Sequence, residues 1–236
     1  APWWRWASTM HPRSARSSSE NGFTPALGHA ALTPLYDAAI ALMTREGRWR
    51  RALLQQVAPR DGDTILDVGC GTGTFALMLK CAAPNARIIG LDPDPVVLAR
   101  AAAKASRAGL DVEFVQGFAR DAARAAGSRV NKIVSSLVFH QTPMNEKRAG
   151  LEAVHAALAH SGQLHIADYG LQRTPLMRAL FKQIQRLDGF ENTTPNARGV
   201  LPALMGEAGF TAVEERAVIP TPTGSLSLYF ARRGDI

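Results

Sequence analysis

Glycines alternate with other residues behind an acid in one short stretch of the chain, Asp67-x-Gly69-x-Gly71-x-Gly73. An apolar run with β-branched residues precedes the glycines, and Ala76-Leu77-Met78-Leu79 follows them at helical spacing. This order predicts a strand, a tight turn and a helix. Such a turn brings backbone N–H groups and a helix N-terminus up to a ligand, and glycine keeps side chains out of the way.

A second acid stands where it can act together with this turn. The next predicted strand, residues 87–92, ends in Asp92, 19 residues after Gly73. A carboxylate at the carboxyl end of a second strand can accept both hydroxyls of a ribose. Asp94 competes with Asp92 for that role and for capping the helix that begins near Pro93. The order of loop, helix, strand and acid predicts a nucleoside site.

Two other nucleotide-binding patterns fit less well. The dinucleotide fingerprint G-x-G-x-x-G would use Gly69 and Gly71, but Thr74 stands where its third glycine belongs. The phosphate-binding P-loop needs a lysine after its last glycine, and none follows Gly73. A nicotinamide-dependent oxidoreductase is therefore disfavoured and stays an alternative.

The acid-and-glycine pattern resembles motif I of the class I S-adenosylmethionine-dependent methyltransferases. The resemblance implies S-adenosylmethionine as cofactor and S-adenosylhomocysteine as product. It also implies an α/β fold of the Rossmann-like, doubly wound kind, with a seven-stranded, mostly parallel sheet whose last strand is antiparallel. Asp67 would orient the loop and, through water, the methionine ammonium group, or it would only tie down backbone amides. The cofactor residues implied up to the second strand are Asp67, Gly69, Cys70, Gly71, Gly73, Asp92 and Pro93.

After the third predicted strand the sequence departs from the family's pattern. Gln116-Gly117-Phe118-Ala119 lies where the family commonly has Gly-Asp-Ala, whose acid reaches the adenine amino group. Phe118 replaces that acid, so we expect Gly117, Phe118 and Ala119 to line the adenine through ring packing and a backbone amide. The alternatives are that Phe118 is simply a core residue, or that Asp121 substitutes for the missing acid.

The segment after the fourth predicted strand resembles the Ser-x-x-x-x-His segment of the ubiquinone/menaquinone type of small-molecule methyltransferase. By this resemblance Ser135 lines the cofactor and His140 faces the methyl group. Histidine is the usual residue for removing a proton near neutral pH, so His140 is the candidate catalytic base. The alternative is that His140 caps the next helix or packs structurally.

Two further segments are candidates for the acceptor pocket. Tyr36-Asp37 resembles a Tyr-Asp pair that contacts or covers the cofactor in related enzymes, so Tyr36 joins the cofactor residues. Residues 169–196 fit between the fifth strand and the next helix, where this family inserts substrate-binding elements. Their polar and aromatic candidates are Arg173, Arg178, Asp188, Phe190 and Asn192.

Length and charge suit a single domain behind a basic arm. The 236 residues carry a net charge of +7, and residues 1–60 hold eight Lys and Arg against three Asp and Glu. We expect residues 1–22 to be a mobile basic arm and 23–236 one methyltransferase domain, with a helical cap at 23–60 and a core at 61–236. The core lacks a strong basic excess, so nucleic acid is an unlikely partner.

Two cysteines predict neither a disulfide framework nor a metal site, and no apolar run predicts a membrane span, so we expect a cytoplasmic protein.

The remaining elements alternate as a parallel sheet requires. Predicted helices cover 74–82, 94–108, 119–126, 145–159, 173–189 and 197–208; predicted strands cover 63–68, 87–92, 111–115, 132–138, 163–168, 211–218 and 224–232.

The acceptor is narrowed by what the sequence lacks. No Asn/Asp-Pro-Pro-Tyr/Trp follows the fourth strand and no Pro-Cys is present, which argues against amino-methylation and C5-methylation of nucleic-acid bases. We therefore expect methyl transfer to a small, partly apolar molecule. The alternatives are a methyltransferase of RNA or protein that uses the basic arm, and an S-adenosylmethionine-binding protein without catalysis.

Overall fold

One seven-stranded sheet organises the computed structural model, which describes residues 46–234. The strand order is β3-β2-β1-β4-β5-β7-β6. The strands are β1 (Thr64–Val68), β2 (Arg87–Asp92), β3 (Glu113–Gln116), β4 (Val130–Ser136), β5 (Leu158–Tyr169), β6 (Phe210–Thr221) and β7 (Gly224–Arg233). The neighbours from β3 to β5 pair in parallel, and β7 pairs antiparallel with both β5 and β6. The predicted mostly parallel sheet with an antiparallel last strand is confirmed.

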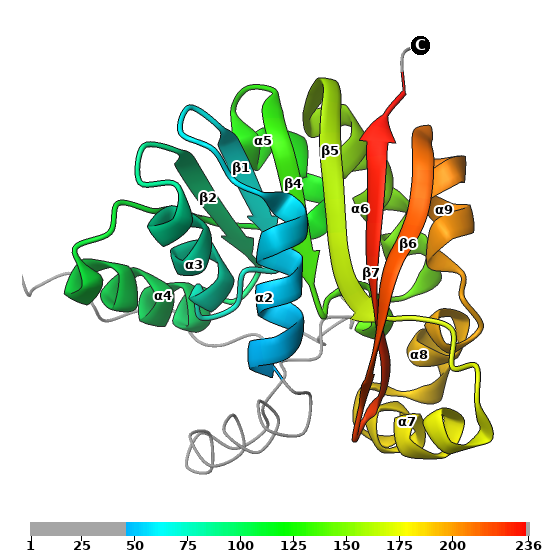
Figure 1. Cartoon of the computed structure of the whole chain (residues 1–236). Helices are drawn as coiled ribbons and strands as arrows, with labels where there is room; N and C mark the ends of the chain where they lie inside the picture. The colour runs from blue at the N-terminus through cyan, green and yellow to red at the C-terminus, as the bar shows by residue number, and fades with distance from the viewer. Residues whose placement is uncertain (1–45, 235–236) are drawn as a thin grey trace, which may run out of the picture.

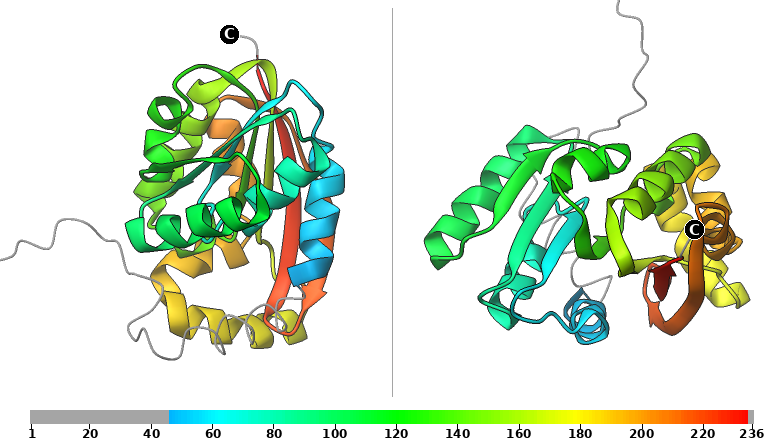
Figure 2. Two further views of the ribbon diagram at one scale, coloured as in Figure 1. Left: turned by 90° about the vertical axis from the view of Figure 1, so that its left-hand side faces the viewer. Right: turned by 90° about the horizontal axis from the view of Figure 1, so that it is seen from above.

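Helices cover both faces of this sheet (Figures 1 and 2). Strand, helix and strand alternate along the chain, so each crossover places its helix on one face. The helices are α2 (Glu46–Val57), α3 (Thr74–Ala82), α4 (Pro95–Ala108), α5 (Ala122–Ala126), α6 (Met144–Ala157), α7 (Pro175–Asp188), α8 (Phe190–Ala197) and α9 (Leu201–Glu207). Two short 3-10 turns, η1 (Ala119–Asp121) and η2 (Phe139–Gln141), follow β3 and β4.

Two apolar clusters hold these layers together. On one face, Trp49 and Leu53 of α2 pack with Phe75 and Leu79 of α3. On the other face, side chains of α5, α6 and α9 pack against the sheet, with Leu151 among them. Burying a large apolar side chain contributes roughly 1.5–3 kcal/mol, so the two clusters fix the sheet between its helices.

The carboxyl ends of the parallel strands form the edge that matters for function. The strand order reverses between β1 and β4, which is where ligands bind in open α/β sheets. Helices α7 and α8 lie beyond this edge instead of beside the sheet, below β5 and β7 in Figure 1. The edge therefore has one side at β1 and β2, beside the glycine turn, and a second side at α7 and α8.

Two predicted boundaries are wrong for identifiable reasons. The helix expected over 145–159 ends at Ala157, and β5 begins at once at Leu158. The regular pairing of β5 with β4 and β7 begins at Gln163, and the register shift before it leaves Ser161-Gly162 in an irregular start of the strand. The helix expected over 197–208 begins only at Leu201 as α9, because Gly199 adopts a φ of 80°, and Phe190–Ala197 form a separate helix, α8, that the pattern does not predict. A glycine in this left-handed conformation ends a helix.

Several predictions fall outside the described residues. These are Tyr36, the arm at 1–22 and the helical cap before Glu46. Among residues 46–234, no helix has the length and apolar character needed to cross a membrane.

The glycine turn predicts a difference between two similar substitutions. A Cβ at Gly69 would lie 2.1 Å from Cγ2 of Val138, whereas one at Gly71 would meet nothing within 4 Å. Both glycines have positive φ, so either alanine costs about 1–2 kcal/mol of backbone strain. Gly69→Ala should cost about 1–3 kcal/mol more through overpacking, measured by denaturant unfolding. Gly69→Ala with Val138→Ala should recover part of that difference; equal losses for the two single variants would contradict the packing argument.

Candidate cofactor and active site

The turn after β1 is fixed by hydrogen bonds of its own backbone N–H groups. The N–H groups of Gly69 and Cys70 both donate to the carbonyl of Leu91 on β2, at 2.7 and 3.0 Å. Gly69, Gly71 and Gly73 have φ values of 71, 53 and 74°, a region that side-chain-bearing residues rarely adopt. Helix α3 begins at the next residue, so its N-terminus and the turn face the same space.

Lys104 of α4 holds this turn from outside. Its ammonium group donates to the hydroxyls of Thr72 and Thr74, at 3.1 and 2.8 Å. The desolvation of this half-buried group lowers the pKa of Lys104. Nothing in the sequence pattern singled out Lys104, because it lies in the next helix but one.

The structure separates the roles of Asp92 and Asp94. Asp94 caps α4, because its Oδ1 accepts the N–H groups of Val96 and Val97 at 2.8 and 3.3 Å. Asp92 ends β2, and its Oδ2 accepts the N–H of Gly71 at 2.9 Å while Oδ1 accepts the N–H of Asp94 at 3.0 Å. Each carboxylate oxygen has a second lone pair, so Asp92 keeps the capacity to accept two more hydrogen bonds. Burial raises the pKa of Asp92.

Asp67 is a buried acid without partners. Both of its carboxylate oxygens are buried and accept no hydrogen bond from the residues that the structure describes. Burial raises the pKa of Asp67 to about 7, and the charge of Arg50 opposes that rise. The backbone N–H of Ala76 lowers the pKa of Asp67 without meeting the geometry of a hydrogen bond, so the alternative in which Asp67 ties down backbone amides stays open. A buried polar group without a partner is costly, and such groups cluster where a ligand or water binds.

Arg50 brings a cation to the same region. It lies on α2 and forms an ion pair with Glu46, while its Nε is buried with no partner among residues 46–234. An unpaired donor and an unpaired carboxylate on neighbouring elements match the two charged groups of an amino acid. The sequence analysis missed Arg50, because its relation to Asp67 exists only once α2 packs on the sheet.

The backbone N–H of Phe118, in the segment after β3, is already hydrogen-bonded within the protein. The N–H of Phe118 donates to Oδ2 of Asp121 at 2.9 Å, which orders Gly117, Phe118 and Ala119. The guanidinium group of Arg120 lies over the Phe118 ring, 4.4 Å from its centroid. Phe118 is half-buried, so it is not the simple core residue of the alternative prediction.

The hydroxyl group of Ser135 forms a hydrogen bond within the sheet. Its Oγ is buried and donates to the carbonyl of Val68 at 3.0 Å, joining β4 to β1 just before the glycine turn. The backbone of Ser135 still lies at the carboxyl end of β4 beside that turn.

His140 lies between two carboxylates. Its Nδ1 is 2.7 Å from Oδ1 of Asp168, and its Nε2 is 3.3 Å from Oδ2 of Asp188. The charges and hydrogen bonds of both acids outweigh the desolvation of the ring and raise the pKa of His140 to about 9. Because a base must be unprotonated, this arrangement does not by itself make His140 ready to accept a proton, and its catalytic role stays a prediction.

Asp168 and Lys147 build the frame around this histidine. Asp168 is fully buried and accepts the N–H groups of Phe139, His140 and Tyr169 at 2.7, 3.2 and 2.7 Å. Lys147 is also fully buried, and its ammonium group donates to backbone carbonyls of η2, the following turn and α8. The sequence held one signal for Asp168: like Asp67 and Asp92, it is an acid at the carboxyl end of an apolar strand.

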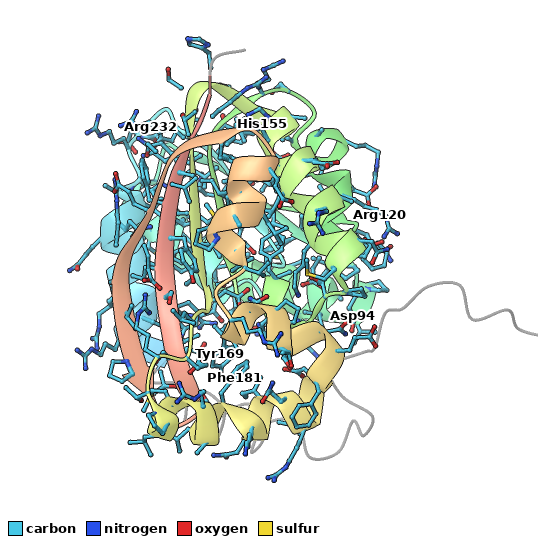
Figure 3. All side chains as sticks on the ribbon, turned by 90° about the vertical axis from the view of Figure 1, so that its right-hand side faces the viewer. Asp94, Arg120, His155, Tyr169, Phe181 and Arg232 are labelled. Carbon is cyan, nitrogen blue, oxygen red and sulfur yellow. The ribbon has the colours of Figure 1, made fainter. Side chains whose placement is uncertain are left out.

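Aromatic rings close the space beside His140. The Tyr169 ring meets the imidazole edge-on, with centroids 5.0 Å apart, and the Phe181 ring of α7 at 4.9 Å. Figure 3 shows Tyr169 and Phe181 next to each other where the end of β5 meets α7. A separate hollow of about 590 Å³ lies on α8, and its lining includes no residue of the glycine turn.

Comparison with known proteins decides the family. Residues 65–162 match the family model described as "Methyltransferase domain". The chain is 29% identical over 177 residues to a demethylmenaquinone methyltransferase from Thermus thermophilus, covering 74% of this chain and 77% of that protein. Residues 65–162 therefore form a methyltransferase domain, and the chain is similar to S-adenosylmethionine-dependent methyltransferases over most of its length. It is thus an enzyme that uses S-adenosylmethionine.

Other relatives of this methyltransferase agree. A ubiquinone/menaquinone biosynthesis C-methyltransferase from Syntrophotalea carbinolica is 25% identical over 157 residues, covering 66% of this chain and 65% of that protein. The fold is shared with the magnesium protoporphyrin IX methyltransferase of Synechocystis, solved with S-adenosylhomocysteine, at a TM-score of 0.60 and 18% identity, covering 80% of this chain and 84% of that one.

The raised pKa of Asp67 predicts how stability depends on pH without ligand. Folding raises this pKa from 3.8 to about 7, so the folded state binds the proton more tightly. The free energy of unfolding should fall as pH rises from about 4 to 7 and stay reduced above that. The Asp67→Asn variant should lose this component, so its stability relative to wild type should increase over the same interval in urea unfolding series.

The exposed Asp111 provides a matched control. Asp111→Asn removes the same charge without touching the buried group. A pH dependence that is identical in wild type and Asp67→Asn would contradict the buried-carboxylate argument.

Proposed function

We propose that this methyltransferase transfers the methyl group of S-adenosylmethionine to a small, partly apolar acceptor that binds under α7 and α8. The observation that carries the proposal is the pairing of an unpartnered buried carboxylate at the glycine turn with a histidine site on the adjacent strands. The first suits the cofactor, and the second suits an acceptor that loses a proton.

The amino-acid end of the cofactor matches Asp67 and Arg50. An ammonium group at Asp67 would satisfy the buried oxygens, directly or through water, and remove the cost of leaving them bare. A carboxylate at Arg50 would find the donor that Glu46 leaves unused. The N–H groups of Gly69, Cys70, Gly71 and Gly73 belong to the same turn, and Lys104 keeps it in place.

The nucleoside end matches the ends of β2 and β3. Asp92 has the free lone pairs that two ribose hydroxyls need, and Pro93 follows it directly, before Asp94 caps α4. Phe118, flanked by Gly117 and Ala119, offers a half-buried ring for packing against adenine. A ring-packing contact fits the absence of the family's acid at this position.

Methyl transfer requires the protein mainly to position the acceptor and the methyl donor. The sulfonium group of S-adenosylmethionine supplies an already activated methyl donor. The protein must align the acceptor atom with it and exclude water, which contributes roughly 7–11 kcal/mol of barrier lowering. Proton removal by a side chain such as His140 adds about 10²–10⁴ in rate for an acidic acceptor.

The names of the relatives suggest the acceptor class. Proteins named for demethylmenaquinone and for ubiquinone or menaquinone biosynthesis are similar over most of this chain. Phe181 and Tyr169 are buried beside His140, so the surroundings of this histidine are aromatic and apolar. An electron-rich aromatic ring carrying hydroxyls is therefore the acceptor to test first.

Asp92 and Asp94 provide a matched pair for testing the cofactor site. Asp92→Ala should weaken binding of S-adenosylhomocysteine at least tenfold in calorimetry, because it removes the acceptor of the ribose hydroxyls. Asp94→Ala should cost about 0.5–2 kcal/mol of stability as a lost helix cap and leave affinity nearly unchanged. Equal affinities for wild type and Asp92→Ala would refute the ribose role.

Arg50 is tested by comparing two ligands. Arg50→Met should weaken S-adenosylhomocysteine, which has the amino-acid end, by about tenfold or more, as loss of a charged hydrogen bond of roughly 1.5–3 kcal/mol requires. It should leave 5′-methylthioadenosine, which lacks that end, within error of wild type. A loss of the same size for both ligands would mean that Arg50 acts only through folding.

A further inference from the structure

The two ring nitrogens of His140 contact two acids that lie on different elements. Asp168 is part of the sheet, buried, and fixed by three backbone N–H groups as well as by Nδ1 of the ring. Asp188 is the last residue of α7, and its side chain keeps 27% exposure. One partner of the histidine therefore belongs to the rigid frame, and the other belongs to a helix outside it.

The position of Asp188 blocks the nitrogen that would do chemistry. Nδ1 is committed to Asp168, so only Nε2 can face an acceptor. Oδ2 of Asp188 lies 3.3 Å from Nε2. No acceptor atom can take a hydrogen-bonding place at Nε2 in that direction while Asp188 stays there.

The charges around the ring favour its cationic form. From β5 come Asp168 and the neutral phenol of Tyr169; from α7 comes Asp188; from α6 comes Lys147, whose pKa burial lowers to about 8. The two acids contact the ring, whereas Lys147 is bonded to carbonyls. With both acids in place the ring is an imidazolium at neutral pH.

Helix α7 is anchored to the sheet along one face only. Its buried contacts are those of Phe181 and Ile184, and Gly189 follows Asp188 with a φ of 87°. Leu176 and Leu187 of the same helix are 63% and 61% exposed, so α7 is only partly anchored. A helix end with a glycine beside it can shift at modest cost.

We propose that Asp188 is a removable positioning residue: docked on Nε2 it keeps the His140–Asp168 pair from accepting a proton, and when the acceptor displaces it the same nitrogen becomes the base. This rests on the proposed function. When Asp188 is displaced, the proton affinity of the ring falls and the imidazolium releases its Nε2 proton to water. The acceptor then gives its own proton to this free Nε2 as it forms its bond to the methyl carbon, and the electron pair of the broken carbon–sulfur bond stays on sulfur. The returning Asp188 stabilises the imidazolium formed in this way, so each turnover releases one proton to water.

The proton affinity of His140 tests the pairing without any methyl transfer. Protein that is isotope-labelled at histidine Cε1 gives one signal for each of its six histidines. The signal that disappears in His140→Gln is that of His140. Wild type should titrate at about 9. Asp188→Asn should lower that pKa by about 1–3 units, a tenfold or greater loss of proton affinity, because one neighbouring charge is removed.

Glu191→Gln is the matched control, since it removes one exposed carboxylate three residues further along. It should leave the titration of His140 at the wild-type value. S-adenosylhomocysteine affinity should be equal in all variants, which verifies that the fold and the cofactor side are intact. An unchanged His140 pKa in Asp188→Asn, or the same fall in Glu191→Gln, would overturn the proposal.

Methyl transfer then tests the base. With chemically reduced demethylmenaquinone as probe, the acidic limb of kcat/KM should move to lower pH in Asp188→Asn by the interval that the titration shows, and not in Glu191→Gln. A lowered His140 pKa with an unmoved limb would overturn the base role and leave methyl transfer standing. Cofactor binding without transfer to this probe in any variant would count against the proposed acceptor, and the titration alone would then decide whether Asp188 controls the proton on His140.

Discussion

A carboxylate cannot be buried at low cost without donors around it, and this constraint shapes the functional edge of the sheet. Three strands carry an aspartate at or one residue before their carboxyl end there: Asp67 in β1, Asp92 in β2 and Asp168 in β5. The protein treats the three differently. Asp168 is saturated by backbone and imidazole, Asp92 is half satisfied, and Asp67 has no partner among the described residues. A cationic ligand that binds at Asp67 would therefore offset the free-energy cost of burying this carboxylate without donors.

Because the three aspartates accept different numbers of hydrogen bonds, they serve different roles along this edge of the sheet. A saturated acid makes a rigid support, so Asp168 fixes η2 and the ring of His140. An unsatisfied acid makes a binding site, so the cofactor side lies at β1 and β2. Val138 joins the two sides, because it packs directly over Gly69 one residue before η2 begins. A change in the glycine turn is thereby felt at the segment that carries His140.

Much of the fold could be predicted because each layer leaves a local pattern. Strands, glycine turns and helices alternate, and the paired positions of Gly69 to Gly73 and Asp92 determine the cofactor half by short-range geometry. The assignment of Asp94 as cap and Asp92 as strand end needed the structure, since both are favoured in either role. The turn expected at Ser161-Gly162 lies in the irregular first part of β5, where Ser161 has a φ of 57°, and the regular pairing with β4 and β7 begins at Gln163.

The remaining parts of the site depend on contacts between distant segments, which no local pattern encodes. Arg50 and Asp67 come together only when α2 packs on the sheet, and Lys147 meets α8 through a residue 45 positions away. His140 shows the limit most clearly. Its spacing after β4 suggested a free base, but two acids from different elements decide its charge. A proton acceptor needs one oriented nitrogen and one open nitrogen, and the fold supplies the first through β5 while it leaves the second to α7. The chemistry on the acceptor side is therefore governed by the least anchored element at the edge, and not by the sheet that defines the family.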